Sequence, residues 1–192
     1  MEKKFELTDK FVFNTFGIKL FQIKCTKSFK YAKEGDLGGY VEKDENLDQE
    51  SDAWVSGDAW VSGDARVSGN AQVSGNAQVY GDARVSGNAQ VYGDAQVYGD
   101  AWVSGDAWVS GNADIENDNN HCGFDCFGSC NRHTHAYLTK DNKVEITCGC
   151  FRGSIEEFEK EVEKTHSGTI YEKQYKAIIN VIKIKFGLTD LI

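Results

Sequence analysis

The middle of the chain repeats with a period of six residues. Ten consecutive hexads, the first beginning at Ala53 and the last at Ala107, read Ala-x-Val-(Ser/Tyr)-Gly-(Asp/Asn). We expect each valine to point inward from a short strand, each alanine to fill a narrow corner, and each Gly-Asp or Gly-Asn pair to form a turn where positive φ suits glycine. Three hexads per coil then predict a parallel β-helix whose coils stack about 4.8 Å apart.

The repeat continues beyond the perfect hexads in weaker form. Upstream, Leu47 falls at the alanine position and Val41 six residues earlier, which predicts that the first coil starts near 35–39. Downstream, Ile115 completes the last strand. The span 47–118 is thus expected to form four coils of eighteen residues, or four to five with the upstream segment.

The flanks of the repeat are expected to cover its two open ends, because unpaired strand edges need protection. Segments 11–13 and 18–23 predict an N-terminal β-hairpin around the turn 14–17. Segments 136–138 and 144–148 predict a second hairpin, followed by a helix capped by Ser154 and a helix over 170–186. The predicted parts are a β cap (1–34), the β-helix (35–118), a Cys/His/Asn/Gly-rich linker (119–135) and an α+β domain of a hairpin and two helices (136–192).

The hexads resemble the left-handed β-helix of bacterial hexapeptide-repeat proteins, a group that includes acyltransferases and γ-type carbonic anhydrases. The resemblance implies a mainly β, left-handed parallel β-helix. The segments 33–41 and 148–154, with the helices that follow, resemble small phage and prophage proteins of unassigned function. That second resemblance implies an accessory gene of a mobile element, often one that counters host defence.

Composition narrows the function classes. The 192 residues carry a net charge of −9, and a protein that grips nucleic acid through its phosphates needs a basic face instead. No run of eighteen apolar residues is present, so neither a membrane span nor a membrane partner is expected. We expect a cytoplasmic protein whose six cysteines are thiols or metal ligands.

The repeat lacks the residues that enzymes of similar fold use. Acyltransferases of this kind rely on a histidine base, and the carbonic anhydrases hold zinc with three histidines. Between Leu47 and Asp118 there is no histidine and no inserted loop. The sequence therefore favours a protein that is not an enzyme.

A Cys/His cluster behind the repeat is the one candidate metal site. It could supply zinc with soft ligands, although the usual Cys-x2-Cys spacing is absent. The alternative is free thiols, some packed as small hydrophobic side chains, with no cofactor bound. The candidates are Cys122, Cys126, Cys130, His133, His135, Cys148 and Cys150.

The turns of the repeat are acidic. Residues eighteen apart should stack, which predicts one ladder of Asp64, Asp82, Asp100 and Asp118 and a second of Asp58 and Asp94 interrupted by Asn76. Span 47–118 holds twelve acidic residues against two arginines, a net charge of −10. Either these residues merely suit the turn, or they form a rigid acidic rod that imitates a nucleic acid backbone.

Aromatic side chains are also expected to face outward from the strands and turns. Exposed Trp and Tyr are enriched at interfaces, and proteins of this shape associate side by side, so a homo-dimer or homo-trimer is expected. The candidate interface residues are Trp54, Trp60, Tyr80, Tyr92, Tyr98, Trp102 and Trp108.

Together these features predict a non-enzymatic phage-type accessory protein that binds and blocks a host protein, such as a CRISPR effector that itself binds nucleic acid. The alternative is a small-nucleotide sponge or a divergent acyltransferase with its site between subunits. That alternative would use His133, His135 or the lysines of the terminal helices, namely Lys173, Lys176, Lys183 and Lys185.

Overall fold

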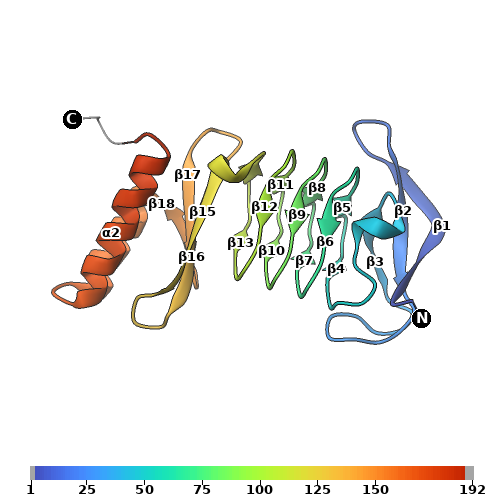
Figure 1. Cartoon of the computed structure of the whole chain (residues 1–192), viewed down its shortest axis with the longest axis horizontal. Coiled ribbons are helices and arrows are strands. Elements are labelled where there is room, and N and C mark those ends of the chain that lie inside the picture. The colour runs from blue at the N-terminus through green and yellow to red at the C-terminus, as the bar shows by residue number, and fades with distance from the viewer. Residues whose placement is uncertain (1–2, 189–192) are drawn as a thin grey trace.

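The computed structural model describes residues 3–188. Figure 1 shows a parallel β-helix in the middle, a β-hairpin at its N-terminal end and a β-sheet with helices at its C-terminal end. The predicted mainly β architecture of about four coils between two caps is therefore confirmed. The left-handed sense remains a prediction.

The β-helix has three faces, each a column of stacked two-residue strands. Val41 pairs with Val61, each valine from Val55 to Val91 lies over the valine eighteen residues on, and Val97 lies over Ile115. The sheets run β1-β2-β3-β5-β8-β11-β14, β13-β10-β7-β4 and β12-β9-β6. The strands are β3 (Leu37–Val41), β4 (Trp54–Val55), β5 (Trp60–Val61), β6 (Arg66–Val67), β7 (Gln72–Val73), β8 (Gln78–Val79), β9 (Arg84–Val85), β10 (Gln90–Val91), β11 (Gln96–Val97), β12 (Trp102–Val103), β13 (Trp108–Val109) and β14 (Asp114–Ile115).

The core of the β-helix is as the hexad pattern predicts. Its inward valines and corner alanines are almost fully buried, and the glycine of each turn adopts a φ between 60° and 73°. Phe5 and Ile23 close this core at one end and Tyr137 closes it at the other.

The first coil departs from the predicted register. Leu47 bridges Val67 and not Ala65, so the first coil is two residues longer than the rest. The additional residues lie in the segment before β4, where the Lys4 ammonium donates to the backbone oxygens of Asp48, Ser51 and Ala53 at 2.6–2.8 Å. An insertion that a buried lysine holds in this way leaves no mark in the hexad pattern itself.

Both predicted hairpins are present. β1 (Phe5–Phe13) and β2 (Lys19–Cys25) pair antiparallel and extend the largest sheet through β3. At the other end, β16 (Arg132–Leu138) pairs with β17 (Val144–Cys148), and the helices are α1 (Ile155–His166) and α2 (Ile170–Lys185). Ser154 and Glu157 form the predicted capping box of α1.

Residues 119–135 are not the linker that the sequence predicted. A short 3-10 helix, η2 (Asp118–Asn120), leads into β15 (His121–Phe127), which pairs antiparallel with β16. With β18 (Phe151–Ser154) they form a four-stranded sheet, β15-β16-β17-β18, that lies between the last coil and the two helices (Figure 1). The Asn/Gly-rich composition concealed a strand whose alternate residues face the last coil and the helices. A second 3-10 helix, η1 (Asp44–Asn46), lies in the first coil.

Candidate functional site

The turns of the β-helix form three columns of acidic or amide side chains. The all-aspartate column holds Asp64, Asp82 and Asp100, and the two mixed columns hold Asp58, Asn76 and Asp94, and Asn70, Asn88 and Asp106. In the mixed columns an amide stabilises a neighbouring carboxylate by a hydrogen bond. Asn76 Nδ2 donates to Asp94 Oδ1 at 2.9 Å, and Asn88 Nδ2 donates to Asp106 Oδ1 at 2.8 Å. In the part of the chain that the structure describes, the all-aspartate column has one such contact, from Lys43 Nζ to Asp64 Oδ1 at 2.8 Å.

Asp118 does not continue the all-aspartate column as the sequence predicted. The coil pattern ends at Ile115, and Asp118 begins η2. Its Oδ1 accepts from the Trp102 backbone N–H at 2.8 Å, where the carbonyl of another coil would otherwise stand. Asp118 therefore caps the open edge of the β12-β9-β6 sheet.

Two of the predicted interface aromatics are covered by the chain's own N-terminal region. Trp54 is 5% exposed and packs edge-on against Phe29, with ring centroids 5.4 Å apart. Trp60 is 9% exposed and packs with Leu20 and Tyr40. The expectation that these two residues form an open interface is wrong, because the segments that cover them are distant in sequence.

The other aromatics form small stacks on the β-helix. The Tyr80 and Tyr98 rings lie 5.0 Å apart and nearly parallel, as their spacing of eighteen residues predicts. Tyr92 and Trp108 are partly buried, with ring centroids 5.9 Å apart. Trp102 is the most open of the set at 54% exposure.

The β12-β9-β6 face carries Trp102 in line with Arg66 and Arg84, all three exposed. Within residues 3–188 neither arginine forms an ion pair. The all-aspartate column borders this face. That column and this face together form one continuous exposed part of the β-helix surface.

The structure divides the seven predicted zinc ligands between the two sides of the terminal sheet. His133 and His135 point toward the last coil, whereas Cys122 and Cys148 pack on the other side of the sheet with the helices. Burial raises the pKa of Cys122 to about 11, so this thiol keeps its proton. In the described part of the chain, no group of three or more His, Cys, Asp or Glu residues is placed to hold a metal ion.

Three histidines form a cluster between the terminal sheet and the last coil. The sequence pattern singled out His133 and His135 but not His121, whose Nδ1 lies 3.0 Å from His135 Nε2. His133 Nδ1 contacts Asp125 Oδ1 at 2.6 Å. Burial, with a smaller contribution from the neighbouring histidines, lowers the pKa of His135 to about 3. His135 is therefore a neutral packing residue, since it is also only 1% exposed.

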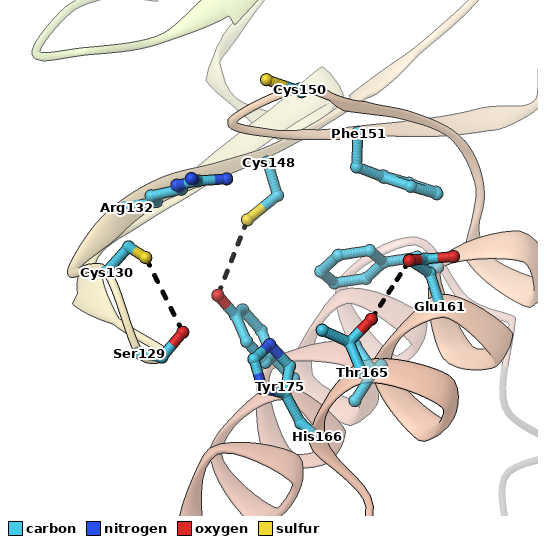
Figure 2. Close-up of a pocket in the computed structure, with 12 residues that line it drawn as sticks. Ser129, Cys130, Arg132, Cys148, Cys150, Phe151, Glu161, Thr165, His166 and Tyr175 are labelled. Carbon is cyan, nitrogen blue, oxygen red and sulfur yellow. Dashed lines mark hydrogen bonds between the residues drawn. The ribbon is translucent and has the colours of Figure 1, made fainter.

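A pocket of about 480 Å³ opens on the opposite side of the terminal sheet, between the sheet and the two helices. Figure 2 shows Arg132, Cys148 and Cys150 on the sheet side and Glu161, Thr165 and His166 on the helix side. The Tyr175 hydroxyl points at the Cys148 thiol, 3.8 Å away. Cys130 also lines this pocket, whereas Cys126 is exposed on β15.

Sequence reasoning did not find this pocket. Arg132 stands beside the Cys/His cluster as a single arginine, and His166 lies at the end of the first predicted helix, so neither marks a pocket in the sequence. Successive side chains of a strand point to opposite faces of the sheet, and in 121–138 this alternation places Cys122, Phe124 and Ala136 on the side of the helices. That alternation is the signal in the sequence that distinguishes the two sides of the sheet.

The lysines of the terminal helices do not form an open basic cluster. Lys176 pairs with Glu172 at 2.7 Å and Lys183 with Glu159 at 2.6 Å. Lys185 donates to the Asp118 backbone oxygen at 3.1 Å. These contacts, with the burial of His135, do not favour the nucleotide-binding and acyltransferase alternatives.

Comparison with known families agrees with the geometry of the coils. Residues 59–75, 77–93 and 95–111 match the model of the YdcK beta-solenoid repeat. The chain is a β-solenoid repeat protein. The three matched stretches of the solenoid begin eighteen residues apart, which is the length of one regular coil. No curated protein matches the chain, and no helix within residues 3–188 has the length and apolar character needed to cross a membrane.

Proposed function

We propose that this solenoid protein works by binding another protein and not by catalysis, and that its all-aspartate column contacts a basic surface of that partner. The observation that carries the proposal is the contrast between the columns. Asp64, Asp82 and Asp100 are exposed, and within residues 3–188 only Asp64 forms an ion pair.

The fold does not need these charges. Asn70, Asn76 and Asn88 occupy equivalent turns with the same left-handed glycine before them. Stacked carboxylates about 4.8 Å apart repel each other by about 1 kcal/mol per pair in water, before salt screening. This repulsion destabilises the column, and the carboxylates are not needed for the turns. A cationic partner would remove the repulsion, so the column is suited to bind one.

The spacing of the column favours a partner that normally binds nucleic acid. One DNA strand presents a phosphate about every 3.4 Å of helix rise, and the solenoid presents a carboxylate about every 4.8 Å on a rigid support. Trp102 and Arg84 lie beside the column and are residue types that often dominate binding energy. The resemblance to small phage proteins makes a host defence protein in the bacterial cytoplasm, such as a CRISPR effector, the first partner to test.

The test removes equal charge from two columns. The variant Asp82→Asn/Asp100→Asn removes two of the three charges of the all-aspartate column and leaves the Lys43–Asp64 pair intact. Asp58→Asn/Asp94→Asn is the matched control in a mixed column. Each protein is used for affinity capture from bacterial lysate at several salt concentrations, with and without competing duplex DNA.

We expect a partner that wild type and control retain, that DNA displaces, and that binds the first variant about tenfold more weakly. The proposal is refuted when every captured protein binds both double variants equally, since the loss or retention would then reflect net charge and not this column.

A further inference from the structure

We propose that the pocket between the terminal sheet and helices α1 and α2 binds a small monocarboxylic acid with an apolar body. The pocket has a volume of about 480 Å³, within the range of small-molecule sites. Its lining residues all follow the β-helix in the chain, in the terminal sheet and helices that lie beyond the last coil (Figure 1), so this inference stands independently of the proposed function.

Arg132 supplies the anion-binding group. Its guanidinium lines the pocket at the start of β16 and packs against the turn at Gly149, where an added Cβ would lie 2.4 Å from Arg132 Nη1. Within the described residues it has no carboxylate partner. An unpaired guanidinium that lies against this turn can bind a carboxylate through two parallel hydrogen bonds.

Tyr175 supplies a second donor. The residue is 5% exposed, yet within residues 3–188 the one hydrogen-bond partner of its hydroxyl is the Cys148 Sγ, a weak partner at 3.8 Å. Burial raises the pKa of Tyr175, so the hydroxyl remains protonated. The His166 ring stacks on the Tyr175 ring at 5.4 Å and holds it from the helix side.

The rest of the wall selects an apolar body. Phe151 and Phe158 pack with ring centroids 5.0 Å apart, and Val162 lies beside them in the pocket lining. Such a surface favours an aromatic or short aliphatic group, because burial of apolar area provides most of the affinity of small ligands.

The charge of the pocket favours a monoanion over a phosphate. Arg132 faces one carboxylate in the lining, Glu161, whose Oε atoms contact Lys164 Nζ and Thr165 Oγ1 at 3.3 and 3.1 Å. These hydrogen bonds lower the pKa of Glu161, which therefore stays ionised. The lining carries one guanidinium and one carboxylate. It therefore tolerates a ligand with one negative charge better than a dianion, whose second charge would have no cationic partner.

The test uses the full-length protein and two probes of one shape, 3-phenylpropionate and its neutral amide, with inorganic phosphate as a third. Binding is followed by titration calorimetry and ligand-observed NMR. We expect 3-phenylpropionate to bind with a Kd of about 0.1 to 1 mM and phosphate to bind more weakly.

Two variants and one control locate the binding. Arg132→Gln is expected to weaken the carboxylate about tenfold and to leave the amide unchanged. Thr165→Trp, at an exposed position of the rim, is expected to abolish binding of both probes by filling the pocket. Lys10→Gln, at an exposed position of the N-terminal hairpin, removes an equal charge and should change neither.

The inference is overturned by any of three results: no saturable binding of 3-phenylpropionate, equal affinity in Arg132→Gln and wild type, or tighter binding of phosphate than of the carboxylate.

Discussion

The buried histidine His135 should make the junction between the solenoid and its terminal sheet sensitive to acid. Its imidazole is 1% exposed, and burial holds its pKa at about 3 in the folded protein. In the unfolded chain a histidine has a pKa of about 6.5. The folded pKa is the lower one, so the contribution of His135 to stability is complete above pH 6.5 and is lost as pH falls toward 3.

The size of the effect follows from the two pKa values. Each pH unit between 6.5 and 3 costs about 1.4 kcal/mol, and at pH 5 the loss relative to pH 7 is about 2 kcal/mol. His121, whose pKa burial also lowers despite the nearby Asp118, adds to the loss in the same direction. Between pH 7 and 5 most carboxylates remain ionised, so the histidines dominate the change.

The measurement is the free energy of unfolding by urea, at pH 7 and at pH 5, for three proteins. Wild type should lose about 2 kcal/mol or more between these pH values, and His135→Gln should lose about 2 kcal/mol less than wild type does. Ser104→Ala is the control, because Ser104 is exposed on the β-helix and has no titratable group, so this variant should keep the wild-type pH dependence. An unchanged pH dependence in His135→Gln would show that the buried imidazole is not the acid-sensitive group.

Two further predictions test the coils and the thiols. Gly87→Ala and Gly105→Ala both place alanine at a φ near 67°, which costs about 1–2 kcal/mol of stability each. Of the two, only the Cβ at position 87 would meet the next coil, 2.8 Å from the Gly105 N atom. Gly87→Ala should therefore be less stable in urea by about a further 1–3 kcal/mol, and equal losses would contradict stacking of these turns. Native mass spectrometry should show a dimer or trimer without zinc. The absence of zinc is expected because Cys148 and His135 lie on opposite sides of the sheet, and one zinc per chain that is lost in Cys148→Ser would contradict this separation.

The candidate surfaces differ in how far the sequence reveals them. The columns of aspartates follow from the period of eighteen, because parallel strands in register stack equivalent turns. Asp118 departs from its column because the coil ends first and its carboxylate replaces a missing carbonyl. Trp54 and Trp60 depart from the expected interface because the N-terminal hairpin and the loop after it fold back over them.

The pocket lies beyond what a single sequence shows. Its lining comes from β16, β17, β18 and both helices, and Arg132 becomes a candidate ligand-binding residue only once the residues around it are known. The same holds for the histidine cluster, since His121 lies fourteen residues from His135 in sequence and meets it only through the β15–β16 pairing.

The sequence by itself determined the solenoid, its regular coils, the two hairpins and the capped helix that begins after Ser154. These features depend on local rules: an inward valine every six residues, a left-handed glycine in each turn, and a capping box. The tertiary structure decided the longer first coil, the covering of two tryptophans and the division of the Cys/His cluster between two faces of a sheet. Those outcomes depend on contacts between distant segments, such as Lys4 with Ser51, whose energies no local pattern encodes.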